Sequence, residues 1–293
     1  MIPDPAPSPA SPVRRAPSCG SNVRAIALRE LRDAVSSRWF CLYTIAFVAL
    51  GLAVSFVSAA GTGGAGLSGF GRTTAGLVNL VLLVVPLMAL TAGAAAIAAD
   101  RERGMLAYLL AQPVARVEVL LGKYLGLGGA LLAAIALGLG AAAVILALHN
   151  AHAAPASILW LAALAFLLAL AMLSAGFLIS SFARRASVAV GTAIFVWLSL
   201  VFVSDLALMA GAVALRIRIE DLFALALANP LQVFKMWSLH AIDANLDVLG
   251  PAGLYALEEF GSRLHALFGA CLLAWIVLPL LAAAAVLARR SPL

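Results

Sequence analysis

The chain has 293 residues, of which 64% are hydrophobic and only 11% are charged, and its mean hydropathy is +1.08. Soluble proteins carry about 25% charged residues, so this composition excludes a soluble domain. The net charge of +6 would suggest nucleic acid as a partner for a soluble protein, but in a membrane protein Lys and Arg gather in cytoplasmic loops.

The first 22 residues are rich in Pro, Ser and Ala and lack a continuous apolar core. They are therefore not expected to be a signal peptide, and we predict a disordered cytoplasmic tail over residues 1–22. Residues 23–38 differ, because apolar side chains lean to one side of a helix and charged ones fill the other. This pattern predicts an amphipathic helix in the cytoplasmic membrane interface. An ordinary charged lead-in to the first span is the alternative.

Six apolar runs are each long enough to cross a hydrocarbon core of about 30 Å. Backbone polar groups inside lipid need internal partners, so these spans are predicted to be helices. The runs cover about residues 39–60, 73–99, 124–148, 158–182, 188–214 and 264–288. We therefore predict an all-α integral membrane protein with one polytopic domain over residues 23–290.

The basic residues indicate how the spans are oriented. With the N-terminus inside, 14 of the 19 Lys and Arg residues fall on inner segments and five on outer ones. Because cytoplasmic loops carry the excess of Lys and Arg, both termini are predicted to be cytoplasmic.

Residues 100–123 form a polar island between the second and third spans. Its apolar centre, Met105 to Ala111, is bounded by Gly104, which can close the preceding helix, and by Pro113, which disfavours helix at the residue before it. The pattern predicts a short helix lying across the cytoplasmic face, where it could dock a partner. The alternative is a solvated loop that only anchors orientation.

Residues 215–263, on the outer side, hold apolar residues at helical spacing interrupted at Asn229-Pro230. Pro230 is expected to divide this segment into two short helices or to turn it back at the membrane edge. Such a layer could seal a translocation path or dock a periplasmic protein. A plain loop that covers the fifth span is the alternative.

Polar residues inside the spans are few, and we single out two as candidates for function. Asn79 falls in the second span and Asp205 in the fifth, where a carboxylate is either functional or near outer water. Hydrogen bonds between helices are the alternative for Asn79, and they are also expected for Thr91, Ser174, Ser180 and Ser181.

The chain is not predicted to be an enzyme. Gly122-Lys123 is followed by Tyr124, and Val117 stands where a phosphate-binding loop needs its first Gly. No catalytic residue is assigned, and any ATP and magnesium are expected on another chain. The cysteines are far apart and show no CxxC spacing, so no metal site is predicted.

The central segment reads D-R-E-R-G-M-L-A-Y-L-L-A-Q-P-V-A-R-V-E-V-L-L-G-K-Y-L-G. This sequence, together with the six-span layout, resembles the coupling segment of type-2 ABC exporter permeases, although Met105 replaces their usual Thr or Ser. The resemblance implies docking to a cytoplasmic ABC ATPase subunit. The implied groove-filling residues are Leu106, Leu109 and Leu110, and the implied rim contacts are Glu102, Arg103 and Arg116.

Two further stretches narrow the resemblance. R-E-L-R-D-A-V-S-S-R-W-F at 29–40 and A-N-P-L-Q-V-F-K-M-W-S-L at 228–239 resemble the permeases of nitrous-oxide reductase maturation. This resemblance implies a homodimer in a bacterial inner membrane and a periplasmic solenoid maturation protein as partner. The residues implied for docking that partner are Asn229, Pro230, Phe234, Met236 and Trp237.

The implied task is maturation of the copper site of nitrous oxide reductase. The permease would either export a sulfur-containing species or transmit ATP-driven motion to the periplasmic partner. Direct copper binding by outer-face residues such as His149, His152 and His240 is not expected, because only the first two have ligand-like spacing. A generic exporter of a drug, lipid or glycan and a non-transporting membrane scaffold remain alternatives.

Overall fold

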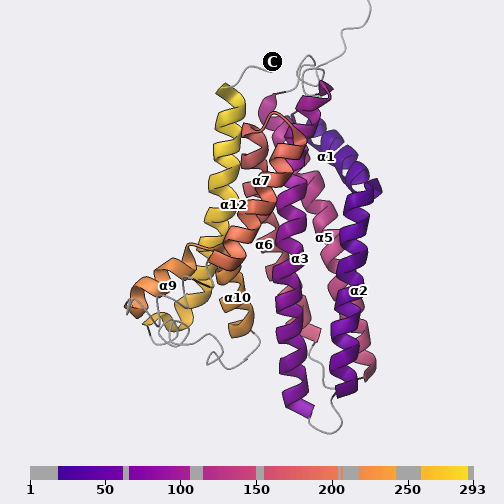
Figure 1. The fold of residues 1–293 in the computed structure, drawn as a ribbon, viewed down its shortest axis with the longest axis vertical. Helices are drawn as coiled ribbons and strands as arrows, with labels where there is room; N and C mark the ends of the chain where they lie inside the picture. Colours follow the sequence, from indigo (N-terminus) through magenta and orange to yellow (C-terminus); the bar gives the residue numbers. More distant parts are fainter. Residues whose placement is uncertain are drawn as a thin grey trace, which may run out of the picture.

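The computed structural model describes residues 19–61, 66–105, 115–149, 155–203, 206, 218–241 and 259–289. These residues form a bundle of long helices with a bent pair of short ones packed against it (Figure 1). The elements are α1 (Cys19–Ser36), α2 (Arg38–Gly61), α3 (Gly66–Glu102), α5 (Arg116–His149), α6 (Pro155–Phe182), α7 (Ala186–Leu198), the π-helical turn η1 (Ser199–Val203), α9 (Ile219–Leu227), α10 (Pro230–Ala241), the 3-10 turn η3 (Gly261–Arg263) and α12 (Leu264–Arg289).

Six helical stretches are long and apolar enough to cross a membrane, in agreement with the six predicted spans. They are Arg38–Val57, Thr74–Glu102, Arg116–Leu148, Ala156–Phe182, Ala186–Val203 and Leu264–Arg289. Within the described ranges every regular element is helical, which confirms the predicted fold class. The fifth span is described continuously to Val203, and of the predicted continuation to residue 214 only residue 206 is described.

The centre of the bundle is a close crossing of α3 and α6. A Cβ atom added at Gly93 would lie 2.6 Å from the carbonyl oxygen of Leu173, and one added at Gly176 would lie 2.5 Å from that of Leu90. Only glycine at both positions allows the two backbones to approach this closely. The crossing holds α3 at the centre, where most of its apolar span is buried.

Two serines of α6 connect this core by hydrogen bonds to neighbouring helices, as expected for polar residues within spans. Ser180 Oγ accepts from the backbone N–H groups of Ile97 and Ala98 in α3, at 3.0 and 2.9 Å. Ser174 Oγ donates to the hydroxyl oxygen of Tyr124 in α5 at 3.0 Å. Thr91 was also expected to bond between helices, but its hydroxyl donates within α3, to the carbonyl oxygen of Leu87 one turn earlier.

Helix α1 lies against the first half of α5 (Figure 1). Glycines along one side of α5 make room for it: a Cβ at Gly122 would meet Ile26, and a Cβ at Gly126 would lie 2.5 Å from the carbonyl oxygen of Ala27. Leu28, on another side of α1, is exposed. The predicted helix over residues 23–38 is therefore present as α1, while its position at the membrane interface stays a prediction.

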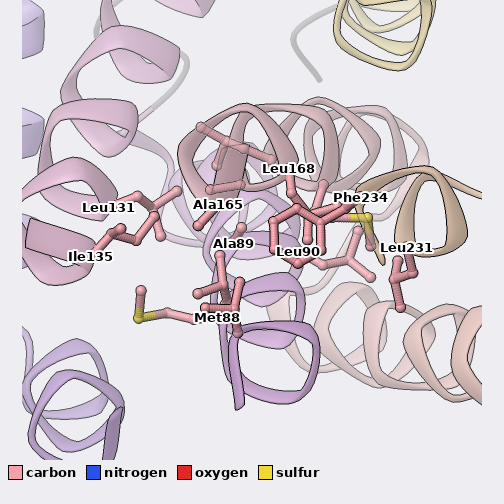
Figure 2. Packing of buried hydrophobic residues seen from close by; sticks show 14 of the residues in the cluster. Met88, Ala89, Leu90, Leu131, Ile135, Ala165, Leu168, Leu231 and Phe234 are labelled. Atoms are coloured by element: carbon pink, nitrogen blue, oxygen red, sulfur yellow. The ribbon is translucent and has the colours of Figure 1, made fainter. Parts of the chain in front are cut away.

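The bent pair α9–α10 enters the bundle from the end opposite to α1 and the C-terminal end of α12 (Figure 1). The two helices make an angle of 105° at the break before Pro230, as the Asn229-Pro230 pair predicts. Helix α10 packs against α3, α6 and α12. Figure 2 shows Phe234 of α10 close to Leu90 of α3 and Leu168 of α6, within one continuous apolar core.

Candidate functional site

The predicted coupling segment begins where α3 ends. Gly104 has a φ of +71°, and its N–H donates to the carbonyl oxygen of Arg101 at 3.1 Å, which confirms that this glycine closes the helix. Arg101 donates to the carbonyl oxygen of Ala183 at the end of α6. Glu102 Oε2 accepts from the N–H of Ala186, the first residue of α7, at 3.0 Å. The end of α3 thus holds the connection between α6 and α7.

The other side of the segment is tied to the last helix. Arg116 donates to the carbonyl oxygens of Leu287 and Ala288, at 2.9 and 3.0 Å. These acceptors belong to the last turn of α12, whose final carbonyls have no partner within the helix. Glu118 accepts from Asn22 of α1 at 3.2 Å. The start of α5 therefore contacts both α1 and α12.

Lys123 is the centre of an ionic cluster formed by three helices. Its side chain is only 3% exposed and pairs with Glu30 of α1 and with Asp100 of α3, the latter at 2.7 Å. Glu30 and Asp100 are themselves 18% and 17% exposed. A nearly buried ammonium between two carboxylates is a strong positional constraint, because separating any member leaves an uncompensated charge. We call Glu30, Asp100 and Lys123 the lysine cluster.

The residues predicted to dock an ATPase divide into two groups. Leu106, Leu109, Leu110 and Pro113 lie outside the described residues. Glu102 and Arg116 make the contacts within the chain given above, while Arg103 is exposed beside Gly104. Contact of any of these residues with an ATPase stays a prediction.

Asn229 lies at the break between α9 and α10, which together we call the α9–α10 hairpin. Its Oδ1 accepts from the N–H of Leu231 at 2.9 Å, which caps α10, and its Nδ2 donates to the carbonyl oxygen of Leu200 at 2.7 Å. Leu200 belongs to the π-helical turn η1 of the fifth span. A single side chain, itself 4% exposed, therefore joins the hairpin to that turn.

The residues implied for docking a periplasmic partner have a different environment from the one expected. Asn229, Pro230, Phe234, Met236 and Trp237 are all buried. They are buried because α10 packs among α3, α6 and α12. In this structure they belong to the protein core, and their contact with a partner stays a prediction.

A pocket of about 170 Å³ lies between α3, η1 and α10. It brings together the candidate residue Asn79 and two polar residues of α10 that sequence reasoning did not single out, Gln232 and Lys235. The spacing of three residues between these two polar side chains was the available signal, because residues three apart are neighbours on a helix surface. Asp205 lies outside the described residues. The remaining lining residues are Leu82, Leu83, Leu200, Val201 and Leu231.

Two histidines, one in α10 and one in α12, are in contact. The rings of His240 in α10 and His265 in α12 have centroids 4.8 Å apart. The ring of His265 also contacts that of Trp237, which belongs to the same helix as His240. In the part of the chain that the structure describes, no three His, Cys, Asp or Glu residues are grouped as metal ligands. The side chains of His149 and His152 fall outside that part.

The sequence was compared with known protein families and proteins. Residues 24–291 match the family model described as ABC-2 family transporter protein. The chain is 32% identical over 275 residues to the probable ABC transporter permease protein NosY of Stutzerimonas stutzeri, covering 90% of this chain and 97% of that one. It is 34% identical over 230 residues to the protein of the same name from Pseudomonas aeruginosa strain PAO1, covering 76% of this chain and 83% of that one. With six apolar helices long enough to span a membrane, the chain belongs to the ABC-2 family of transporter proteins and is a multi-pass permease subunit.

Proposed function

We propose that this permease is the membrane subunit of an ATP-driven complex that matures the copper site of nitrous oxide reductase. The observation that carries the proposal is similarity to two NosY permeases, at 32% and 34% identity over 97% and 83% of their lengths. Fold-level similarity alone would support only a generic ABC-2 transporter.

The proposed partner inside the cell is an ABC ATPase subunit, which would bind ATP and magnesium and dock on Leu106, Leu109 and Leu110. The two sides of that docking segment contact the ends of α6, α7, α12 and α1 through Arg101, Glu102, Arg116 and Glu118. A displacement of the segment would therefore move several helix ends together. In our proposal, ATP-driven closure of two ATPase subunits displaces two such segments in a permease homodimer.

We place the permease in a bacterial inner membrane with both termini on the cytoplasmic side, which puts the α9–α10 hairpin on the periplasmic side. A periplasmic solenoid maturation protein would dock there. Helix α9 is the better docking surface, because Ile219 and Leu225 are exposed whereas α10 is buried. The complex would export a sulfur-containing species or pass mechanical motion to this partner.

The first test is purification of the tagged permease from its native membranes with identification of co-purifying proteins by mass spectrometry. We expect an ATPase with a phosphate-binding loop, and its loss when Leu106, Leu109 and Leu110 are all changed to Glu. Leu28→Glu is the control, because Leu28 is an exposed leucine of α1, the helix that Glu118 at the start of α5 contacts. Recovery of no ATPase with the folded protein would contradict the coupling proposal and favour a scaffold.

The second test separates the maturation role from a generic exporter. In a denitrifying host that lacks this permease, we expect nitrous oxide reductase to be made with its copper site incomplete, as measured by copper content and optical spectrum. The wild-type gene should restore the site, and the triple Leu→Glu variant should not. A fully loaded reductase in the deletion strain would leave generic export as the better description.

A further inference from the structure

Lys235 lines the pocket between α3, η1 and α10, and its surroundings differ from those of Lys123. The chain has two lysines, Lys123 and Lys235. Lys123 lies between two carboxylates, whereas Lys235 has no ion-pair partner among the described residues. None of the eight residues that line its pocket is acidic, and five are Leu or Val. Among the described residues, this ammonium therefore has no compensating charge, which an anion could supply.

The neighbours of Lys235 add hydrogen-bond donors to its charge. Asn79 of α3 and Gln232 of α10 line the same pocket, and the side-chain amide of each carries two N–H donors. Gln232 is only 8% exposed, so its amide is held within the protein rather than in open solvent. An ammonium and two amides are suited to the oxygens of an anion, since charge-assisted hydrogen bonds are the stronger kind.

The position of the pocket on α10 favours the same charge. Gln232 and Lys235 are the third and sixth residues of α10, a 12-residue helix. The N-terminal end of a helix carries a partial positive charge of about half an elementary charge. The helix end and the lysine thus contribute the same sign of potential to one pocket.

Volume limits the ligand. Pockets for drug-sized ligands occupy about 300–1,000 Å³, and this pocket has about 170 Å³. It has room for one small group and opens beside Asn79 and Leu83, which are both exposed. A bulky glycan or drug would not be enclosed.

We propose that Asn79, Gln232 and Lys235 form a binding site for a single oxyanionic group, either a free tetrahedral anion or the phosphate of a lipid headgroup. This site goes beyond the proposed maturation role. Its occupancy can be measured on the permease alone, so that failure of one proposal does not affect the other.

The presence of only two lysines allows a direct test. The whole permease, in nanodiscs of phosphatidylcholine, is treated with a lysine-selective acylating reagent, and modification of each lysine is measured by peptide mass spectrometry. Sulfate is added at constant ionic strength, with gluconate as the control anion. We expect about tenfold slower modification of Lys235 when sulfate is about ten times its Kd. Lys123, which is nearly buried, should stay unmodified throughout and so reports that the protein is folded.

A second set of nanodiscs contains phosphatidylglycerol and no sulfate, which distinguishes the two sources of the anionic group. Protection by sulfate indicates a free anion, and protection by phosphatidylglycerol alone indicates a lipid headgroup. Unchanged modification of Lys235 under both conditions would overturn the proposal.

Variants connect the effect to the three side chains. Asn79→Leu removes one exposed amide and should reduce the protection by sulfate or lipid several-fold. Lys235→Met should abolish binding of radiolabelled sulfate in equilibrium dialysis, or retention of phosphatidylglycerol in native mass spectrometry, and Lys235→Arg should retain it. Equal binding by folded Lys235→Met and wild-type protein would also overturn the proposal.

Discussion

The two lysines of this permease represent two uses of charge within a membrane bundle. Lys123 is nearly buried between Glu30 and Asp100, so its charge is compensated and serves to hold three helices together. Lys235 lines an apolar pocket with two amides and has no described carboxylate partner. The comparison teaches that a charge inside a bundle must be interpreted with its neighbours: carboxylates around Lys123 fix a junction of helices, whereas the lack of a described carboxylate at Lys235 is the basis of the anion site that we propose.

The largest effect is expected from removing the compensated charge. Lys123→Met leaves two carboxylates side by side with little solvent, so it should lower the free energy of unfolding by about 3–5 kcal/mol. Chemical denaturation in detergent micelles would measure the loss. The double variant with Glu30→Gln should recover part of it, because one of the two stranded charges is gone. A loss below 1 kcal/mol would contradict the structural role of the lysine cluster.

A smaller effect is expected where α1 approaches α5 beside that cluster. Gly126→Leu places a side chain where the Ala27 backbone and Glu30 now lie, and overpacking of this kind costs about 1–3 kcal/mol. Gly140→Leu is the matched control, because a Cβ atom added to Gly140 of the same helix meets nothing within 4 Å. Thermal unfolding should separate the two variants. Similar midpoints would argue that α1 is not held against α5.

At the α9–α10 hairpin, Asn229→Ala removes both the cap of α10 and the bond to Leu200. This loss should lower the free energy of unfolding by about 1–2 kcal/mol. Asn229→Ser should cost less, since a serine hydroxyl can still cap the helix but is too short to replace the second bond. The difference between the two variants, measured by denaturation, reports the worth of the cap. Equal losses would assign the whole effect to the link with η1.

The smallest effect on stability is expected from Lys235→Met, within about 1 kcal/mol of wild type, because no described partner is left unpaired. Loss of stability comparable to that of Lys123→Met would show that Lys235 is compensated after all. The comparison between the two lysines would then fail.

Local patterns were sufficient for much of the architecture. Hydropathy predicts the six spans because a helix in lipid must be apolar along its own length. The turn at Gly104 and the break at Pro230 were likewise predicted, since each follows from the backbone of one residue. The resemblance also placed the chain in its family without knowledge of any long-range contact.

Tertiary structure alone decided which residues meet. Lys123 and Glu30 are 93 positions apart, and their pairing depends on α1 lying in the glycine face of α5. Phe234 and Trp237 were expected to face a partner but are buried, because the orientation of α10 is set by the helices around it. Asn79 lines one pocket with Gln232 and Lys235, which are distant in the sequence and are brought beside it by the packing of α10 against α3. The sequence by itself determined the helices and their breaks, which depend on local backbone and lipid exposure. The packing of distant helices decided the ionic junction and the pocket.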